Sequence, residues 1–240
     1  MKKDKLFMKE KPVIGMIHTN HTDEESSLQL AQREIEIYLK YGVYPLMENY
    51  FGDDDDCENI LRWMQQKHND KIYGLNILGD IYRSFELAEK YGVSFIQIDS
   101  VCGHLKPDLD EEYESMLKFL RRDSDCTVLG GVRFKYQPIN SGRTLAEDLK
   151  IGMGRCDAVV CTGEGTGLAT PMDKVEKFKQ ILGDFPVIIG AGVTIDMVEA
   201  CRRNSDGVIV GSWFKNNHRA KYSVNEDDVK DFMLRWNAHP

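Results

Sequence analysis

The chain has 240 residues, 42% of them hydrophobic and 29% charged, a composition typical of an ordinary soluble globular protein. Its formal net charge of −8 argues against a nucleic-acid-binding surface or an anionic-membrane surface, but it allows a local phosphate site. No apolar run approaches the length of a membrane span, and the opening residues, MKKDKLFMKEK, lack the apolar core of a signal peptide.

Short apolar runs alternate with amphipathic segments along the chain, after a polar start (1–11) that we expect to be a loose lead-in. The expected strands are 13–17, 44–47, 72–75, 94–98, 126–132, 157–160, 187–189 and 207–210. The expected helices are 23–41, a helix opened by the acidic run 53–56 that ends near 67, 80–91, 110–122, 145–153, 171–182, a helix N-capped by Thr194 that ends at 201, and 225–236. These eight strand–helix units predict that residues 1–240 form one domain, a single parallel (β/α)8 barrel. A doubly wound open sheet is the alternative, but its dinucleotide-binding fingerprint is missing after the first strand.

The six cysteines form no CxxC pair and no metal-binding spacing. Most of them fall in expected strands or helices, so we expect reduced thiols in a cytoplasmic protein. Their positions are Cys57, Cys102, Cys126, Cys156, Cys161 and Cys201.

The last two expected strands each end at a glycine turn. In a (β/α)8 barrel, the turns after strands seven and eight form a phosphate site, where main-chain N–H groups and a helix N-terminus hold the anion. The alternative is that these glycines only tighten strand-to-helix turns. The predicted phosphate-binding residues are Gly190, Ala191, Gly192, Gly211 and Ser212.

Polar residues directly follow most of the other expected strands. In a barrel these carboxyl ends form the active-site face, although any one of the residues could be a satisfied polar group at the rim. Glu48 and Asp99 are candidates for a base, an acid or a stabiliser of developing positive charge. The predicted catalytic residues are His18, Glu48, Asp99 and Lys135. The predicted substrate-binding residues are Asn49, Asn76, Arg133, Thr162, Gly163 and Glu164, the last three in a Gly-rich loop suited to covering a ligand.

Arg133 and Lys135 lie two apart on one expected strand, which predicts that both side chains point to the same side. They could bind a second anionic group, or Lys135 could act as a base or amine nucleophile of lowered pKa. They could instead balance the charges of Glu48 and Asp99.

His18 and His21, together with Glu48, could hold a divalent metal ion. The spacing HxxH in a loop is not diagnostic, however, and the acidic run 53–56 has the pattern of a solvated helix start. We therefore predict no metal and no other cofactor.

Motifs in chain order resemble the BtpA/SgcQ family from Pro12 to about Lys215: PVIGMIH, MENYFGD, GLNIL, VRFK, VCTGEGTG, GAGVT and DGVIVGSWFK. The resemblance implies a (β/α)8 barrel of the ribulose-phosphate-binding type and implies no single reaction. Family members often carry His where this chain has Arg133, and Asn where it has Asp99.

Taken together, these features predict an enzyme that acts on a phosphorylated sugar or sugar-nucleoside. Isomerisation, C–N or C–O glycosidic cleavage and retro-aldol cleavage all suit the groups at the strand ends. The alternative is a non-catalytic assembly or regulatory factor that keeps an anion-binding barrel. The expected partner is a phosphorylated small molecule, without nucleic acid and without a membrane span; a homo-oligomer is left open.

Overall fold

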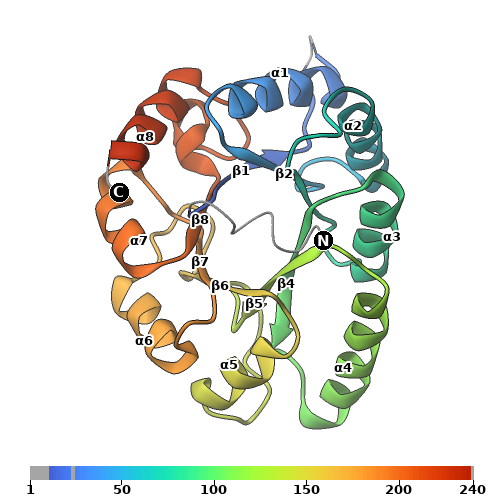
Figure 1. Cartoon of the computed structure of the whole chain (residues 1–240), viewed down its shortest axis with the longest axis vertical. Helices are drawn as coiled ribbons and strands as arrows, with labels where there is room; N and C mark the ends of the chain where they lie inside the picture. The colour runs from blue at the N-terminus through green and yellow to red at the C-terminus, as the bar shows by residue number, and fades with distance from the viewer. Residues whose placement is uncertain (1–10, 23–24, 239–240) are drawn as a thin grey trace.

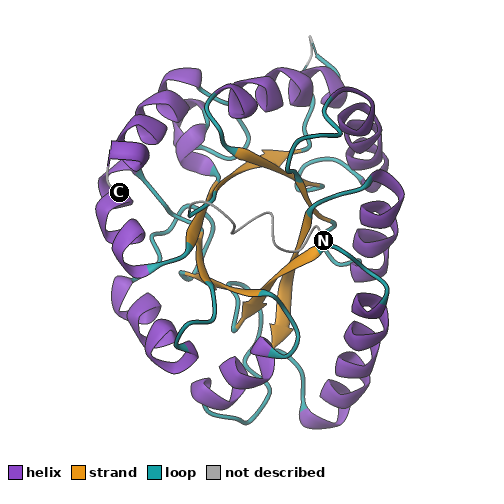
Figure 2. Ribbon diagram, in the orientation of Figure 1, coloured by secondary structure: helices purple, strands orange, loops and turns teal. Residues whose placement is uncertain are grey.

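Eight parallel strands close into a barrel, and a ring of helices surrounds it (Figures 1 and 2). The computed structural model describes residues 11–22 and 25–238, so most of the expected lead-in lies outside the described residues. The strands pair in chain order, and β8 closes the barrel on β1, with Ile209 beside Ile14. The predicted (β/α)8 barrel is confirmed.

The strands are β1 Val13–His18, β2 Tyr44–Glu48, β3 Gly74–Asn76, β4 Phe95–Cys102, β5 Thr127–Val132, β6 Ala158–Thr162, β7 Val187–Gly190 and β8 Gly207–Val210. The α-helices are α1 Ser27–Lys40, α2 Asp54–Lys67, α3 Ile81–Tyr91, α4 Pro107–Arg122, α5 Leu145–Met153, α6 Met172–Leu182, α7 Val198–Asn204 and α8 Glu226–Ala238. Three short 3-10 helices are η1 Ile195–Met197, η2 Ser212–Phe214 and η3 Asn216–His218. None of the described helices is long and apolar enough to span a membrane.

Several boundaries differ from the sequence prediction. Helix α1 begins at Ser27, after a capping box formed by Ser26 and Gln29, whereas the expected helix began at 23, and residues 23–24 lie outside the described part. Helix α4 begins at Pro107, three residues earlier than expected, because proline suits the first turn of a helix. Thr194 holds the expected N-cap position, but it makes no side-chain cap bond, and the 3-10 turn η1 replaces the first turn of the expected helix.

Strand β4 differs most from the prediction in length. It runs to Cys102 rather than 98, and its pairing with β5 shifts register between Ile98 and Cys102. Asp99 therefore lies within a strand at an irregularity and not after the strand's end. Such irregularities redirect side chains near functional sites.

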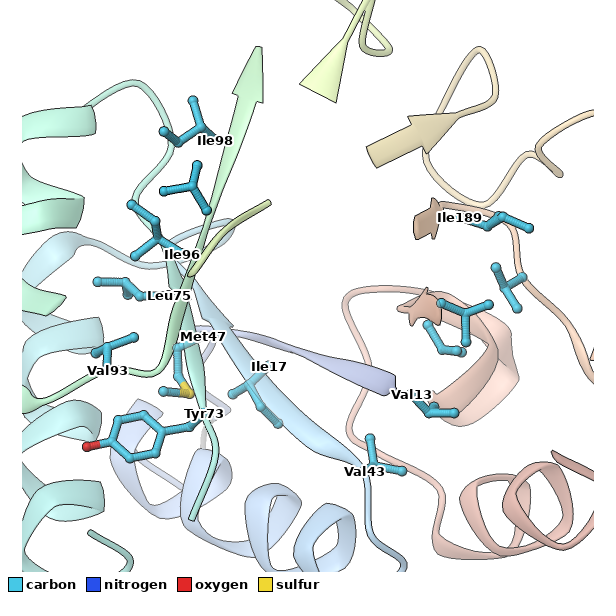
Figure 3. Close-up of a cluster of buried hydrophobic side chains, with 14 of the residues drawn as sticks. Val13, Ile17, Val43, Met47, Tyr73, Leu75, Val93, Ile96, Ile98 and Ile189 are labelled. Carbon is cyan, nitrogen blue, oxygen red and sulfur yellow. The ribbon is translucent and has the colours of Figure 1, made fainter. Parts of the chain in front are cut away.

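The core has two layers, because side chains alternate between the two faces of each strand. The inner cluster fills the barrel, and the outer cluster fills the space between the strands and the helices. Figure 3 shows part of the outer cluster, where the side chains of Leu75 on β3, Tyr73 just before β3 and Val93 before β4 lie toward the helices. The inner cluster comprises Ile14, Met16, Leu46, Phe95, Leu129, Phe134, Ala158, Val160, Ile188 and Ile209.

All six cysteines lie within the described residues, and each is buried without a disulfide. Burial raises the pKa of thiols such as Cys102, to about 11, which keeps them protonated and unreactive near neutral pH. The expectation of reduced thiols agrees with this arrangement.

The barrel interior requires glycine at position 74. A Cβ atom there would lie 2.2 Å from the ring of Phe95, which is fully buried in the inner cluster. Because the barrel is closed around this ring, the ring cannot move away without displacing other core side chains.

We expect Gly74→Ala to destabilise the fold by about 1–3 kcal/mol, as overpacked cores do. Gly154→Ala is the matched control, because Gly154 has helical φ and ψ and its nearest atom to a new Cβ lies at 3.4 Å. Urea denaturation of both variants measures the difference. Equal stability of the two variants would show that Phe95 repacks freely.

Candidate functional site

A cavity of about 220 Å³ opens at the carboxyl ends of the strands, inside the ring of loops that follows them. Its lining comes from β1, β2, β4, β6, β7 and β8 and from the loops that follow the strands. Ten of the predicted site residues line it: His18, Glu48, Asp99, Lys135, Thr162, Gly190, Ala191, Gly192, Gly211 and Ser212.

One amide joins the two candidate carboxylates. The Nδ2 of Asn76 donates to Glu48 Oε1 at 2.9 Å and to Asp99 Oδ1 at 3.1 Å. A second amide, Gln97 Nε2, donates to the same Asp99 oxygen at 3.0 Å. Burial raises the pKa of Glu48 to about 8, and the neighbouring charge of Asp99 adds to this shift. Glu48 therefore gains or loses a proton close to neutral pH.

His18 is a neutral imidazole beside Glu48. Burial lowers its pKa to about 3, and the positive charges of Lys215 and Lys135 contribute to the shift. Its Nδ1 lies 3.2 Å from the carbonyl oxygen of Ala220, so Nδ1 carries the proton and donates. The lone pair of Nε2 then faces Glu48 Oε2 at 3.5 Å, and the contact joins two neutral groups rather than an ion pair.

Lys135 is the only Lys or Arg side chain that lines the cavity within the described part of the chain. Its Nζ donates to Thr166 Oγ1 at 3.1 Å, and its main-chain N–H donates to Thr162 Oγ1 at 3.0 Å. These bonds attach the loop after β5 to the end of β6 and to the Gly-rich loop beyond it. The ammonium group of Lys135 thus has a defined place at the cavity wall.

The two predicted phosphate turns lie side by side at the ends of the paired strands β7 and β8. Ala191 and Gly192 both have left-handed backbones, with φ of 77° and 65°. A Cβ at Gly192 would lie 2.1 Å from the carbonyl oxygen of Leu168, so the loop after β6 packs directly on the β7 turn. The glycine therefore permits a close approach of backbone to backbone, as well as lining the cavity.

The structure does not bring Arg133 into the cavity, and the prediction that Arg133 and Lys135 share one face was wrong. Strand β5 ends at Val132, and Arg133 has φ of 49°, which interrupts the alternation of side chains. Its Nε donates to the fully buried Asp148 at 2.8 Å. Arg143 Nε donates to the other Asp148 oxygen at 2.9 Å, so these guanidinium groups neutralise a carboxylate on α5.

Four other predicted positions lie outside the cavity lining. The amide of Asn49 accepts from the Leu78 N–H at 2.8 Å and donates to Asp54 at 2.7 Å, so it joins the loop after β3 to the start of α2. Asn76 lies behind the carboxylates that it joins, and Gly163 and Glu164 follow β6 beyond the lining.

His21 is exposed at the surface, away from the pair formed by His18 and Glu48. Within residues 11–22 and 25–238, no three His, Cys, Asp or Glu side chains are placed to hold a metal ion together.

Several lining residues escaped the sequence prediction. Gln97 could have been found, because it lies two residues before Asp99 on the same strand and shares its face. Tyr50 and Tyr136 lie in loops at the rim and carry no sequence signal of this role. The buried pair Lys215–Glu34, 2.8 Å apart, was also missed because it joins positions 181 residues apart.

This barrel, with its polar cavity at the carboxyl ends of the strands, defines a TIM-barrel protein with the ligand-site placement of that class. The chain belongs to the BtpA family, which matches residues 63–238. An uncharacterised protein of Pyrococcus horikoshii is 30% identical over 243 residues, covering 92% of each chain. An uncharacterised protein of Thermococcus kodakarensis is 26% identical over 246 residues, covering 93% of this chain and 94% of that protein.

Solved structures share the fold at low sequence identity. The tryptophan synthase alpha chain of Legionella pneumophila has a TM-score of 0.70 at 14% identity, covering 99% of this chain and 98% of that one. N-(5'-phosphoribosyl)anthranilate isomerase of Pyrococcus furiosus has a TM-score of 0.61 at 14% identity, covering 95% of this chain and 100% of that one. At this identity the likeness concerns the fold.

The raised pKa of Glu48 predicts a specific pH dependence of stability. The folded chain keeps a proton up to about pH 8 that the unfolded chain releases near 4.5. The contribution of Glu48 to the free energy of unfolding is therefore largest below pH 4.5 and is lost as the pH rises toward 8. Glu48→Gln does not titrate, so its stability relative to the parent should rise from pH 5 to pH 8, by up to about 1.4 kcal/mol per pH unit.

Urea unfolding of parent and variant at several pH values measures this difference. His18 titrates in both proteins, so its contribution largely cancels. The exposed Glu176→Gln on α6 is the control and should give a difference that does not change with pH. A constant difference for Glu48→Gln as well would mean that Glu48 is ionised throughout this range.

Proposed function

We propose that this protein is an enzyme that acts on a phosphorylated sugar or sugar-nucleoside, with Glu48 as its proton-transferring group. The observation that carries the proposal is the raised pKa of Glu48, about 8, at a cavity that also holds an ammonium group and two glycine turns. A carboxyl group that titrates near neutral pH can both give and take a proton during turnover.

The phosphate would lie at the turns after β7 and β8, against Gly190–Gly192, Gly211 and Ser212. Lys135, in the same cavity, would supply the positive charge that the anion needs. The P. furiosus neighbour supports this assignment, because its name specifies a phosphoribosyl substrate on the same fold. The sugar would then extend from the phosphate turns toward the opposite wall, where Glu48 and Asp99 lie.

The carboxylates would act as a pair in the chemical step. Asn76 holds one oxygen of each, which fixes their separation and leaves the remaining oxygens for substrate. Isomerisation, glycosidic cleavage and retro-aldol cleavage all move a proton at a sugar carbon or oxygen, and Glu48 would carry that proton. We assign Lys135 to charge stabilisation, because its Nζ is held by Thr166 at the cavity wall.

An assembly or regulatory factor would gain little from this arrangement. Burying Glu48 beside Asp99 costs free energy, because both charged forms lose water and repel each other. A barrel kept only as a scaffold would be more stable with apolar residues at these positions. The cost is understandable if the pair performs chemistry.

We expect Gly211→Asp to abolish binding of phosphorylated ligands, because it places a carboxylate where the phosphate would lie. The fold should tolerate it, since a Cβ at Gly211 meets its nearest atom, in Met16, at 3.5 Å. Gly211→Asn is the matched control of equal size without charge, and it should weaken binding far less. Thermal shifts with inorganic phosphate and sugar phosphates measure ligand binding by both variants. Equal affinity of the parent and Gly211→Asp would show that the phosphate does not bind at this turn.

We expect Glu48→Gln to lower turnover by about 10²–10⁴-fold while ligand binding is largely kept, because the amide preserves shape but transfers no proton. The test uses whichever sugar phosphate or nucleotide a screen shows to be consumed. The parent's kcat/KM should change with a pKa near 8, and that limb should vanish in the variant. Turnover within a few-fold of the parent would show that Glu48 does not transfer the proton.

A further inference from the structure

A second cavity, of about 360 Å³, adjoins the barrel-mouth cavity. It lies outside β3 and β4, where α3 and α4 face these strands, and the two cavities share Leu78, Gln97 and Asp99 in their linings. The two cavities therefore meet at these three residues. We call it the β3–β4 cavity.

Two residues of this cavity's lining carry buried polar atoms that have no hydrogen-bond partner among the described residues. These atoms are Oγ of Ser100, a residue only 6% exposed, and Nδ1 of His104. Neighbouring polar groups of the lining are engaged: Tyr113 donates to the Ser100 carbonyl oxygen at 2.6 Å, and Ser84 donates to the Asp80 carbonyl oxygen at 3.0 Å. A buried polar atom without a partner is costly, so these two atoms call for a bound group.

The fold holds both residues in place. Ser100 lies on β4 two residues after Ile98, which belongs to the outer cluster, so the alternation of side chains places Ser100 on the outer face as well. The ring of His104 packs edge-on against Tyr113, with centroids 5.1 Å apart.

The charge of the cavity restricts what it can bind. Asp99 is the only Asp, Glu, Lys or Arg of its described lining, and burial lowers the pKa of His104, so that ring is neutral. A second anionic group would meet a carboxylate without any compensating cation. A neutral group that offers hydrogen bonds suits Ser100, His104, Gln97 and Gln137.

We propose that the β3–β4 cavity is a specificity subsite, which binds the neutral hydroxyl- or amide-bearing end of the substrate through Ser100 and His104. This inference rests on the proposed function, because the other end of the same molecule carries the phosphate held after β7 and β8. It narrows the substrate to phosphate esters long enough to pass Asp99. Ser100 and His104 act in binding and not in the chemical step.

Calorimetric titration with inorganic phosphate, glycerol 3-phosphate, ribose 5-phosphate and uridine 5'-monophosphate tests the proposal. The parent should bind at least one of the two longer esters about tenfold or more tighter than inorganic phosphate. Ser100→Ala should weaken that ester by about two- to tenfold, the range for one lost hydrogen bond. Ser100→Leu, which also fills part of the cavity, and His104→Phe, which removes the ring nitrogens, should weaken it at least as much, and all variants should bind inorganic phosphate as the parent does.

Ser115→Leu on the exposed side of α4 is the matched control and should leave every affinity unchanged. Unchanged affinity for the longer esters in Ser100→Ala and His104→Phe would overturn the proposal and indicate that ordered water satisfies the two atoms. The proposal also fails if the parent binds no ester tighter than inorganic phosphate.

A separate measurement distinguishes failure of this inference from failure of the proposed function. If no phosphate compound binds, the proposed function fails, and uridine and D-ribose are then titrated while the ¹⁵N resonances of His104 are recorded. A change in the Nδ1 chemical shift on addition of uridine or D-ribose, absent in Ser100→Leu, would support a subsite for neutral ligands. An unchanged Nδ1 chemical shift would contradict the proposed subsite as well.

Discussion

Closure of the sheet between β8 and β1 is the interaction on which the rest of this structure depends. Pairing of Ile209 with Ile14 removes both free edges and brings the first and last strands of the chain together. It also forces the carboxyl ends of all eight strands into one ring. Residues as distant in sequence as His18 and Ser212 can line one cavity only because this ring is closed.

The ring concentrates charge, and nearby interactions offset the cost. Asn76 shares one amide between Glu48 and Asp99, and the ammonium of Lys135 makes ionisation of Glu48 easier. The buried ammonium of Lys215, which is paired with Glu34, helps to keep His18 neutral. The protonation states at the mouth are therefore set jointly by groups from β1, β2, the loop after β5 and the segment after β8.

Much of the fold and part of the site could be predicted from the sequence, because both depend on local patterns. Apolar runs, glycine stops and the polar residues that follow them predicted the barrel and placed Glu48, Asp99 and Lys135 at its mouth. The direction of a side chain beyond a strand end depends instead on single backbone angles and distant partners. Arg133 turns away through its positive φ toward Asp148, 15 residues further along the chain, and this contact leaves no local pattern.

The cluster around Asp148 and Asp110 has a consequence for how variants of this protein are interpreted. Arg143 bridges the two carboxylates, and Arg133 and Arg155 each hold one of them, which fastens the loop after β5 to helices α4 and α5. Lys135 lies two residues beyond Arg133 on that loop, so its ammonium is preorganised by a framework that never touches a ligand. Loss of Arg133 or Arg143 would remove a contact that anchors the loop carrying Lys135, so a variant of either that behaved like a Lys135 variant would not by itself indicate a lost ligand contact.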